Sequence, residues 1–400
     1  MRVLLAHPGT QHAPRLAAEL HRRGFLQGFW SGFAFGDDAA WLRAVPAKMR
    51  AKLGGRICRG VPDRMIRCRP LLEWRALRRM ARGERGEEVF HDRNERFQKS
   101  IPVDSLALSR AVVGFDTSSW ILAERCRAAG LPFILEQTVA HPLHKQSMME
   151  EASRRFPAWA EREEPRPGYL LAAERTEHEL ADRIVAGSSY CRRTLVEQGV
   201  SPQKIVVNPY GVERPAEDFV PRSDVGHRPL RFLFLGFLSL RKGLPLLLEA
   251  WEKAGLRDAE LALAGGIRPE HRHFLPQNDT VHYAGFVPRS SLPSFLAQQD
   301  VNVLPSYSEG FAISLIEAMA AGLPIMATEH TGAPDIISPG REGFVLPVGD
   351  LDALVERLRW FSENRDKIPA MSAAAKKKSQ EFTWERYGEK YEAMLHELGS

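Results

Sequence analysis

The chain has 400 residues, of which 44% are hydrophobic and 26% charged, and a net charge of +5. Such a length exceeds what one hydrophobic core usually serves and predicts two domains, at roughly 100–200 residues each. The composition is ordinary for a soluble globular protein and argues against a disordered or fibrous chain.

The compartment is expected to be the cytoplasm. No stretch reaches the roughly 18 apolar residues that a membrane-spanning helix needs, and the apolar run at the N-terminus is too short for a signal peptide. The four cysteines are far apart and include no C-x-x-C pair. They are expected to be reduced thiols, which form neither a disulfide framework nor a zinc site.

The chain opens with a strand, a glycine turn and a helix. Residues 2–6 (RVLLA) predict a buried strand, Gly9 lies in the turn, and Leu16 and Leu20 mark one face of a helix that ends before Gly24. This order is typical of a Rossmann-like unit. Since the G-x-G-x-x-G fingerprint is absent, a dinucleotide site is not indicated. Gly9 is either a simple tight turn or part of a ligand-facing loop.

Positive charge is concentrated in one stretch. Residues 41–86 hold 14 Lys and Arg against 3 Asp and Glu, a local net charge of +11. Because the whole chain has a net charge of +5, the other residues together have a net charge of −6. Two apolar stripes of helical period run through it, one formed by Trp41, Val45, Met49 and Leu53, the other by Leu72, Ala76 and Met80. Basic amphipathic helices of this kind dock on anionic lipid surfaces. The alternative is that both stripes pack on the domain, and nucleic-acid binding is the weakest option because no recognition motif is present.

The rest of the first half repeats strands and helices. A strand near residues 111–115 and a helix ending before Gly130 precede a strand at 133–136, which is followed by Glu136, Thr138, His141 and His144. Ligands of open α/β sheets bind at the carboxyl ends of strands, so these polar side chains are candidate site residues. Further strands are predicted near 183–187 and 204–208, and the Pro-rich, charged residues 214–228 read as a linker.

The second half restarts the pattern. The apolar strand 231–237 leads into the loop SLRKG and a helix over 245–254, and strands are predicted at 261–266 and 281–288. A strand, a glycine, basic residues and a helix together describe a phosphate cradle, in which Arg241 and Lys242 would face a diphosphate. Without further context, both side chains could equally be solvated.

Residues 307–328 predict a loop, a helix and a strand with one acid in the loop and one in the helix. These acids are Glu309 and Glu317. Between them lie the free N–H groups of the first helical turn, which favour a bound anion such as phosphate. An anion flanked by two carboxylates that accept hydrogen bonds from hydroxyls describes a sugar nucleotide. The plain alternative is two solvated acids.

The order E-G-F-x5-E-A-M-A-x-G-x-P over residues 309–324 resembles the signature of the retaining glycosyltransferases of family 4, also called glycosyl transferases group 1. The resemblance implies an α/β fold of the GT-B type, with two Rossmann-like domains facing across a cleft and a C-terminal helix crossing back to the first domain. The implied divisions are an acceptor-binding domain at 1–213, a linker at 214–228, a nucleotide-sugar domain at 229–378 and the crossing helix at 379–400.

The resemblance also implies roles for particular residues. Glu309 would bind the donor sugar, Glu317 would hold the ribose, and Lys242 belongs to the family's G-x-L-x-x-x-K-G loop. This chain departs from the family at Phe237, where an arginine is usual, and Arg241 is the candidate replacement. The implied catalytic set is Glu309, Lys242, Arg241 and His141. The implied donor-binding set is Gly9, Gly236, Arg241, Lys242, Gly265, Phe286, Val287, Glu309, Gly310, Phe311, Ala312, Ile313 and Glu317.

The predicted reaction is sugar transfer from a nucleotide diphosphate to an acceptor hydroxyl with retention of configuration. The acceptor would be a sugar, a glycolipid or a polysaccharide. No metal and no other cofactor is expected. The alternatives are an epimerase or phosphorylase of the same fold, and a sugar-nucleotide-binding or membrane-docking module without turnover. A peripheral position on the inner membrane face, through residues 41–86, is the alternative to a freely cytoplasmic protein.

Overall fold

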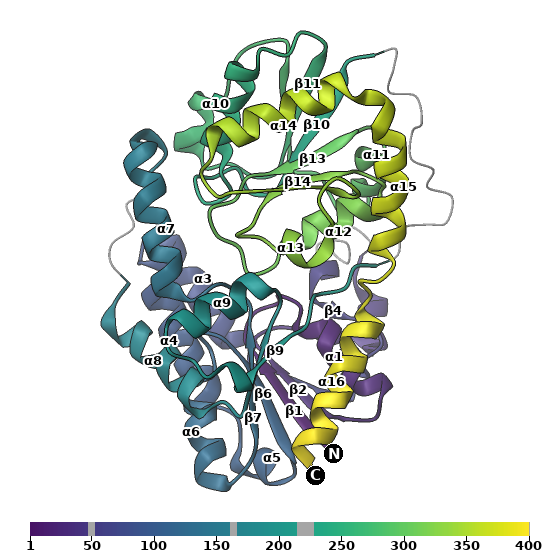
Figure 1. Ribbon diagram of the computed structural model, residues 1–400. Helices are drawn as coiled ribbons and strands as arrows, with labels where there is room; N and C mark the ends of the chain where they lie inside the picture. The colour runs from purple at the N-terminus through teal and green to yellow at the C-terminus, as the bar shows by residue number, and fades with distance from the viewer. Residues whose placement is uncertain (47–52, 161–165, 214–227, 400) are drawn as a thin grey trace.

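In the computed structural model, which describes all residues except 47–52, 161–165, 214–227 and 400, two parallel β-sheets form the centres of two domains (Figure 1). The first sheet has the order β5-β2-β1-β6-β7-β8-β9 and the second the order β12-β11-β10-β13-β14-β15. Helices cover the sheets, so most strands are buried on both faces. All five residues of β1 and of β6 are buried, for example. Burial on both sides explains why these strands read as continuous apolar runs.

The first domain contains residues before 214. Its central sheet is formed by β1 (Val3–His7), β2 (Leu26–Ser31), β5 (Ile66–Cys68), β6 (Ala111–Phe115), β7 (Phe133–Gln137), β8 (Arg183–Ala186) and β9 (Ile205–Val207), and a small separate pair by β3 (Phe35–Gly36) and β4 (Ile57–Cys58). Its α-helices include α1 (Ala13–Arg22), α3 (Pro70–Ala81), α4 (Gly86–Lys99), α5 (Val103–Ala107), α6 (Trp120–Ala129), α7 (Pro142–Arg155), α8 (Gly168–Leu180) and α9 (Ser189–Glu197).

The second domain has the same construction. Its strands are β10 (Leu230–Leu235), β11 (Ala259–Ala264), β12 (Val281–Gly285), β13 (Val301–Leu304), β14 (Ile325–Thr328) and β15 (Gly343–Leu346). Its helices are α10 (Leu244–Ala254), α11 (Leu292–Leu296), α12 (Ile313–Ala320), α13 (Ala333–Ile336), α14 (Leu351–Glu363) and α15 (Ile368–Ser379), and α16 (Trp384–Gly399) ends the chain. Short 3-10 turns, such as η6 (Pro269–Phe274), connect several of them.

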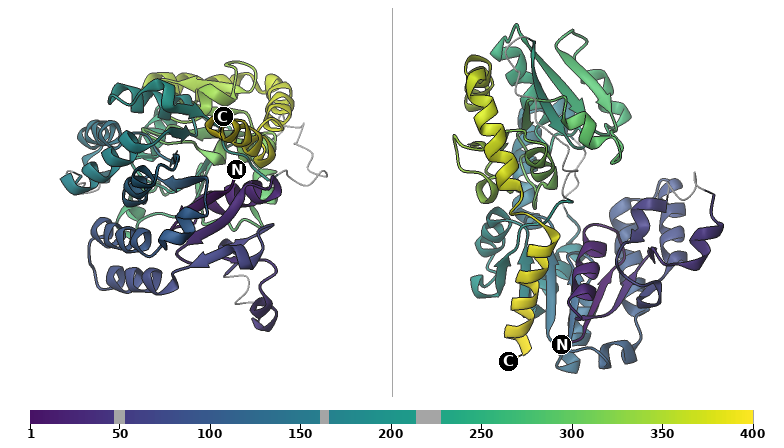
Figure 2. Two further views of the ribbon diagram at one scale, coloured as in Figure 1. Left: turned by 90° about the horizontal axis from the view of Figure 1, so that it is seen from below. Right: turned by 90° about the vertical axis from the view of Figure 1, so that its right-hand side faces the viewer.

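The last helix returns to the first domain. It runs down beside α1, and the two chain ends lie close together (Figures 1 and 2). The Tyr387 hydroxyl donates to the buried Glu136 carboxylate at 2.7 Å, and the other oxygen of that carboxylate lies 2.9 Å from His12 Nε2. Two parallel-sheet domains joined by a returning helix confirm the predicted fold class.

The structure corrects the prediction for the basic stretch. Residues 41–53 do not form one helix in the part that is described. A 3-10 turn, η1, covers Ala40–Ala44, and Val45 already has extended backbone. Val45 precedes Pro46, whose ring disfavours helical backbone at the residue before it. Met49, a member of the predicted stripe, lies outside the described residues.

The second predicted stripe does lie on a helix, α3, and it faces the domain. Ala76 is buried, and Leu72 and Met80 are partly buried. This stripe is therefore part of the domain's packing and is not available to a membrane. Among the described residues, no helix combines the length and apolarity that a bilayer crossing requires. All four cysteines belong to the described part of the chain and are free thiols.

Candidate functional site

Glu309 lies at the centre of a charged cluster in the second domain. Its Oε1 atom is 2.6 Å from Arg241 Nη1 and 2.8 Å from Lys242 Nζ, and the Ser306 hydroxyl lies 3.4 Å away. The Glu309 side chain is only 10% exposed. Burial opposes its ionisation, but the charges of Lys242 and Arg241 outweigh that effect and lower the pKa of Glu309. The site therefore holds a carboxylate that is ionised at neutral pH beside two cations.

Two loops that follow neighbouring strands bring these residues together. Arg241 and Lys242 come after β10, and Glu309 comes after β13, which pairs with β10. The Tyr307 backbone N–H donates to the Arg241 carbonyl at 2.9 Å, which ties one loop to the other. Since the carboxyl ends of parallel strands share one edge of the sheet, this is where a ligand of an open α/β sheet binds.

Glycines allow the close approach of these loops. Gly243 has φ +74°, and a Cβ there would lie 1.9 Å from the Pro305 carbonyl oxygen. Gly265, at the end of β11, has φ +148°, and a Cβ there would lie 1.7 Å from the Gly236 carbonyl oxygen. Any other residue would clash with backbone at both positions. A Cβ on Gly236 would in turn contact the Lys242 side chain at 3.4 Å.

The start of α12 is adjacent to the cluster. Ala312 is its N-cap and Ile313 its first residue, and no side chain caps this end. The first N–H groups of a helix have no partner within the helix and favour an anion. The uncapped end of α12 therefore fits the phosphate position that the sequence predicts.

The second predicted acid, Glu317, lies apart from the Lys242 cluster. It projects from α12 and pairs with Arg289 Nη1 at 3.2 Å. Burial raises the pKa of Glu317 against the opposing charge of Arg289. Phe286, which follows β12 and precedes Val287, is 78% exposed and free to contact a ligand.

The candidate residues of the first domain also follow strands. Gly9 lies after β1, where a Cβ would approach His7 Nε2 to 2.9 Å. His141 is the N-cap of α7, its Nδ1 accepts from the Leu143 N–H at 3.3 Å, and its ring centre lies 5.5 Å from that of His178. Burial lowers the pKa of His141 to about 4, so the imidazole is neutral at physiological pH. No contact joins His141 or Gly9 to the Lys242 cluster among the described residues.

The Glu309 loop touches the first domain, which sequence reasoning missed. The Ser188 hydroxyl donates to the Gly310 carbonyl, and the Tyr190 hydroxyl donates to Ser308 Oγ at 3.0 Å. A Cβ on Gly310 would lie 1.8 Å from the Thr138 carbonyl oxygen. The only hint in the sequence was that Ser188 and Thr138 follow predicted strands.

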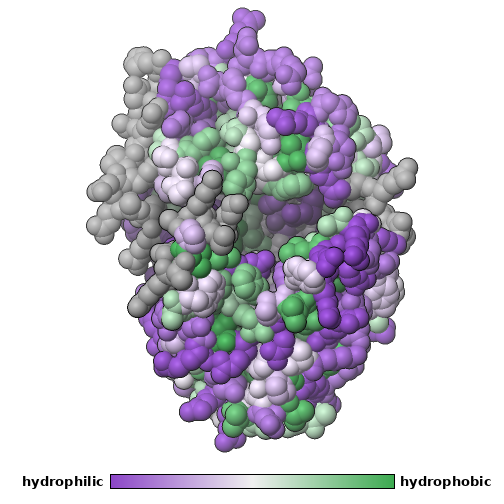
Figure 3. Space-filling view, turned by 180° about the vertical axis from the view of Figure 1, so that it is seen from behind, coloured by the Kyte–Doolittle hydropathy of each residue, from purple (hydrophilic) through white to green (hydrophobic). Residues whose placement is uncertain are grey.

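Phe311 also packs against the first domain. It is 6% exposed, and its ring centre lies 5.5 Å from that of Tyr210. A Cβ on Gly187, in the first domain, would lie 2.9 Å from the Phe311 Cβ. Viewed from behind, the molecule is hollowed between its two domains (Figure 3). The cleft is thus open on that side, and the loops after β8 and β13 meet within the molecule.

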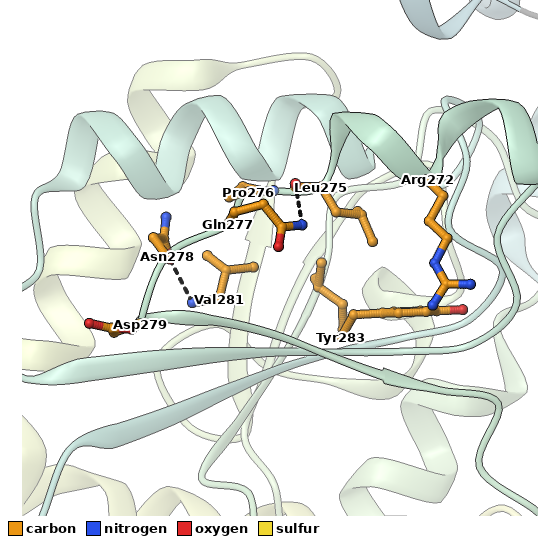
Figure 4. A pocket seen from close by; sticks show the side chains of 9 residues that line it. Arg272, Leu275, Pro276, Gln277, Asn278, Asp279, Val281 and Tyr283 are labelled. Carbon is orange, nitrogen blue, oxygen red and sulfur yellow. Dashed lines mark hydrogen bonds between the residues drawn. The ribbon is translucent and has the colours of Figure 1, made fainter.

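A separate surface cavity of about 460 Å³ lies between η6, the following loop and β12 (Figure 4). The Arg272 guanidinium stacks over the Tyr283 ring at 5.6 Å, and the Tyr283 hydroxyl donates to the Gly265 carbonyl. None of the predicted site residues lines this cavity. Within the described parts of the chain, no three His, Cys, Asp or Glu side chains are grouped so as to hold a metal ion.

Solved structures share the two-domain fold. Sucrose-phosphate synthase from Thermosynechococcus elongatus superposes on 100% of this chain and 99% of its own, with a TM-score of 0.67 and 17% identity. HepE from Anabaena, solved in complex with UDP-glucose, covers 99% of this chain and 100% of its own, with a TM-score of 0.63 and 14% identity. At this identity the likeness establishes the GT-B fold.

The resemblance to the glycosyl transferases group 1 is confirmed over the second domain. Residues 217–378 match the sequence model of the family described as glycosyl transferases group 1. The amylovoran biosynthesis glycosyltransferase AmsK from Erwinia amylovora is 31% identical over 202 residues, which are 47% of this chain and 49% of AmsK. The chain thus spans about half the length of the curated relatives it matches first.

Proposed function

We propose that this protein is a retaining glycosyltransferase of family 4 that transfers a sugar from a nucleoside-diphosphate donor to an acceptor hydroxyl. The observation that carries the proposal is the convergence of Arg241 and Lys242 on Glu309 beside the uncapped start of α12. The match of residues 217–378 to the group 1 glycosyl transferases supports it, as does the structural likeness to HepE, which was solved in complex with UDP-glucose.

Each group has a part in the proposed reaction. The leaving diphosphate accumulates negative charge as the bond to the sugar breaks, and preorganised positive groups stabilise that charge in the transition state. Arg241, Lys242 and the N–H groups at the start of α12 are the positive groups. Lys242 Nζ pairs with Glu309 Oε1 at 2.8 Å, so its ammonium is held in place before a ligand arrives.

Glu309 would orient the sugar. A carboxylate that is ionised in a buried position accepts strong hydrogen bonds from sugar hydroxyls. Because it is already paired with two cations, it is a poor nucleophile, and a double displacement through Glu309 is not proposed. The acceptor hydroxyl attacks on the face that the diphosphate leaves, and its proton passes to the diphosphate. The new glycosidic bond then has the configuration of the donor.

The acceptor would bind at the first domain, near Gly9 and His141. His141 is kept neutral by burial, so it can accept or donate a hydrogen bond without adding a charge. The proposed acceptor classes are sugars, glycolipids and polysaccharides. No metal is proposed, because Arg241 and Lys242 would neutralise the diphosphate. Turnover that EDTA abolishes and Mg²⁺ or Mn²⁺ restores would contradict this part.

The first experiment is a thermal-shift screen of UDP-, GDP-, ADP- and dTDP-sugars. A donor at 100 times its dissociation constant should stabilise the protein by about 2.7 kcal/mol. The donor that binds is then used in a transfer assay, and NMR of the product reads the anomeric configuration. An inverted product would overturn the retaining assignment, and an epimerised donor without acceptor would favour the epimerase alternative.

Lys242→Met tests the site itself. This variant should lose the thermal shift, because removing a charge-assisted contact costs about 1.5–3 kcal/mol. Lys253→Met is the matched control, since Lys253 forms a similar ion pair, with Asp352 at 2.6 Å, on the surface of the same domain. Equal donor binding by both variants would place the diphosphate elsewhere.

A further inference from the structure

Helix α3 carries a stripe of large apolar side chains that are more than half exposed. Leu71, Trp74 and Leu77 are 67%, 53% and 51% exposed, on the side of the helix opposite the buried Ala76. At 100° per residue these three side chains fall within one arc of the helix surface. Three large apolar side chains in a row are more than the scattered exposure of an ordinary surface.

Arginines lie beside the stripe. Arg75, Arg78 and Arg82 follow the same exposed face, and the Arg78 guanidinium stacks on the Trp74 ring at 4.6 Å from its centre. None of the three has an acidic partner among the described residues. By contrast, every acid of α3, α4 and the turn between them is already paired with a base: Glu73, Glu84, Glu87, Glu88, Asp92 and Glu95.

The net field of this face is therefore positive, because its acids are neutralised and its three outer arginines are not. A surface cavity of about 350 Å³ opens between α3 and α4, lined by these arginines together with Arg79, Arg93 and Arg96 and by one acid, Asp92. The cavity is large enough for an anionic lipid head group, and the apolar side chains beside it could enter the membrane interface.

The buried side of α3 faces the loop that follows β1. Glu73, on the buried side of α3, approaches Gly32, and a Cβ on Gly32 would lie 2.4 Å from the Pro8 carbonyl of the loop after β1. In the right-hand view of Figure 2, the purple-to-blue segment that contains α3 forms the outer edge of the first domain, away from α16.

We propose that the exposed face of α3, with the cavity beside it, docks on a membrane surface that carries anionic lipids. Trp74, Leu71 and Leu77 would enter the interface, as amphipathic interfacial helices do, and Arg75, Arg78 and Arg82 would bind the head groups. The inference goes beyond the proposed function, since it concerns where the enzyme acts. It also replaces the stripe that the sequence predicted on α3, which is packed on the domain, with the exposed one. With only three apolar side chains, docking is reversible and depends on the anionic charge.

The test is co-sedimentation of the full chain with vesicles of phosphatidylcholine, with and without phosphatidylglycerol. The protein should sediment with the anionic vesicles at low salt and be released at high salt. Arg75→Gln and Arg82→Gln should each weaken binding about five-fold, the equivalent of one basic residue near the surface. Trp74→Ala combined with Leu77→Ala should weaken it about ten-fold, because less apolar surface is buried.

Matched controls lie elsewhere on the first domain. Val103→Ser and Leu108→Ser remove apolar side chains that are 71% and 67% exposed, and Arg175→Gln removes an exposed charge from α8. These variants should bind vesicles like the unchanged protein. All α3 substitutions are on the surface, so circular dichroism and the donor thermal shift should stay unchanged, which separates this inference from the proposed function.

Brominated phosphatidylglycerol provides an independent reading. It should quench tryptophan fluorescence of the unchanged protein and quench Trp74→Phe less. Equal binding to neutral and anionic vesicles, or α3 variants that bind like the controls, would overturn the inference. So would capture by single-stranded DNA without vesicle binding, or a dimer in light scattering that Trp74→Ala dissolves.

Discussion

The guanidinium of Arg241 lies 2.6 Å from the carboxylate of Glu309, and Lys242 contacts the same oxygen at 2.8 Å. A second bond, from Arg241 Nη1 to the Ser308 carbonyl at 2.8 Å, holds the arginine over the loop. The carboxylate therefore shares its cations with whatever anion enters the site. In the proposed function, the two cations bind the diphosphate and the carboxylate binds the sugar, so a substitution of Glu309 should affect the two ligands differently.

Glu309→Gln should preserve binding of a nucleoside diphosphate but reduce transfer of the sugar. The variant frees Arg241 and Lys242, so a nucleoside diphosphate should bind at least as tightly as to the unchanged protein. Transfer of the sugar should fall about 10- to 100-fold, because a charged hydrogen-bond acceptor contributes about 1.5–3 kcal/mol. Isothermal titration and a transfer assay measure both quantities. Undiminished transfer would show that Glu309 does not hold the sugar.

Gly310→Ala should hold the domains apart. Its new methyl group would overlap the Thr138 carbonyl, whose oxygen lies 1.8 Å from the added Cβ, and backbone cannot yield as a side chain can. We expect turnover to fall about 100-fold, the effect of a displacement near 1 Å at the reacting groups. Small-angle scattering should show a larger radius of gyration.

Gly168→Ala is the control for that substitution. Gly168 begins α8, and a Cβ there would meet nothing within 4 Å. It should leave both turnover and the radius of gyration unchanged. If Gly310→Ala behaves in the same way, the contact between the loops after β7 and β13 does not govern the reaction.

Tyr387→Phe should weaken the attachment of α16 to the first domain. It removes the donor to one oxygen of Glu136, a side chain with no solvent exposure. The free energy of unfolding should fall by about 1–3 kcal/mol in urea. Tyr210→Phe is the control, because the buried Tyr210 hydroxyl has no hydrogen-bond partner in the described structure. Equal losses would show that packing, rather than the hydrogen bond, holds α16.

His178→Gln should make the protein less sensitive to acid. Burial lowers the pKa of His178 to about 3, and Nε2 contacts Gln137 Oε1 at 2.8 Å. Between about pH 6.5 and pH 3 the unfolded chain binds a proton that the folded chain does not, so the histidine reduces stability as the pH falls through this window. At pH 5 the difference is about 2 kcal/mol, from 1.36 kcal/mol for each pH unit.

Urea unfolding of both proteins at pH 7.5 and pH 5 measures that difference. Glutamine keeps a donor for Gln137 but does not titrate, so the variant should lose less stability on acidification. Parallel losses in the two proteins would mean that His178 is protonated in the folded state.

Local patterns were sufficient for much of the fold. Apolar runs in the sequence predicted the strands β1, β6, β10 and β14, because both faces of a parallel sheet are buried. The turn before α10 was predicted from Gly236 and Gly243. Both have positive φ, which favours glycine, and a Cβ on Gly243 would clash with the Pro305 carbonyl. The motif of residues 309–324 in turn predicted the family to which the second domain is matched.

The tertiary structure decided which surfaces meet. Helix α3 has apolar residues on more than one face, and its packing against α4 selects Leu72 and Ala76 for burial and leaves Trp74 outside. The Ser188–Gly310 bond joins residues 122 positions apart. Helical and strand periods report only on neighbours along the chain, so the sequence by itself determined the elements and the loop chemistry. The contacts between domains, and the face of α3 that remains exposed, follow from packing over distances that no local pattern records.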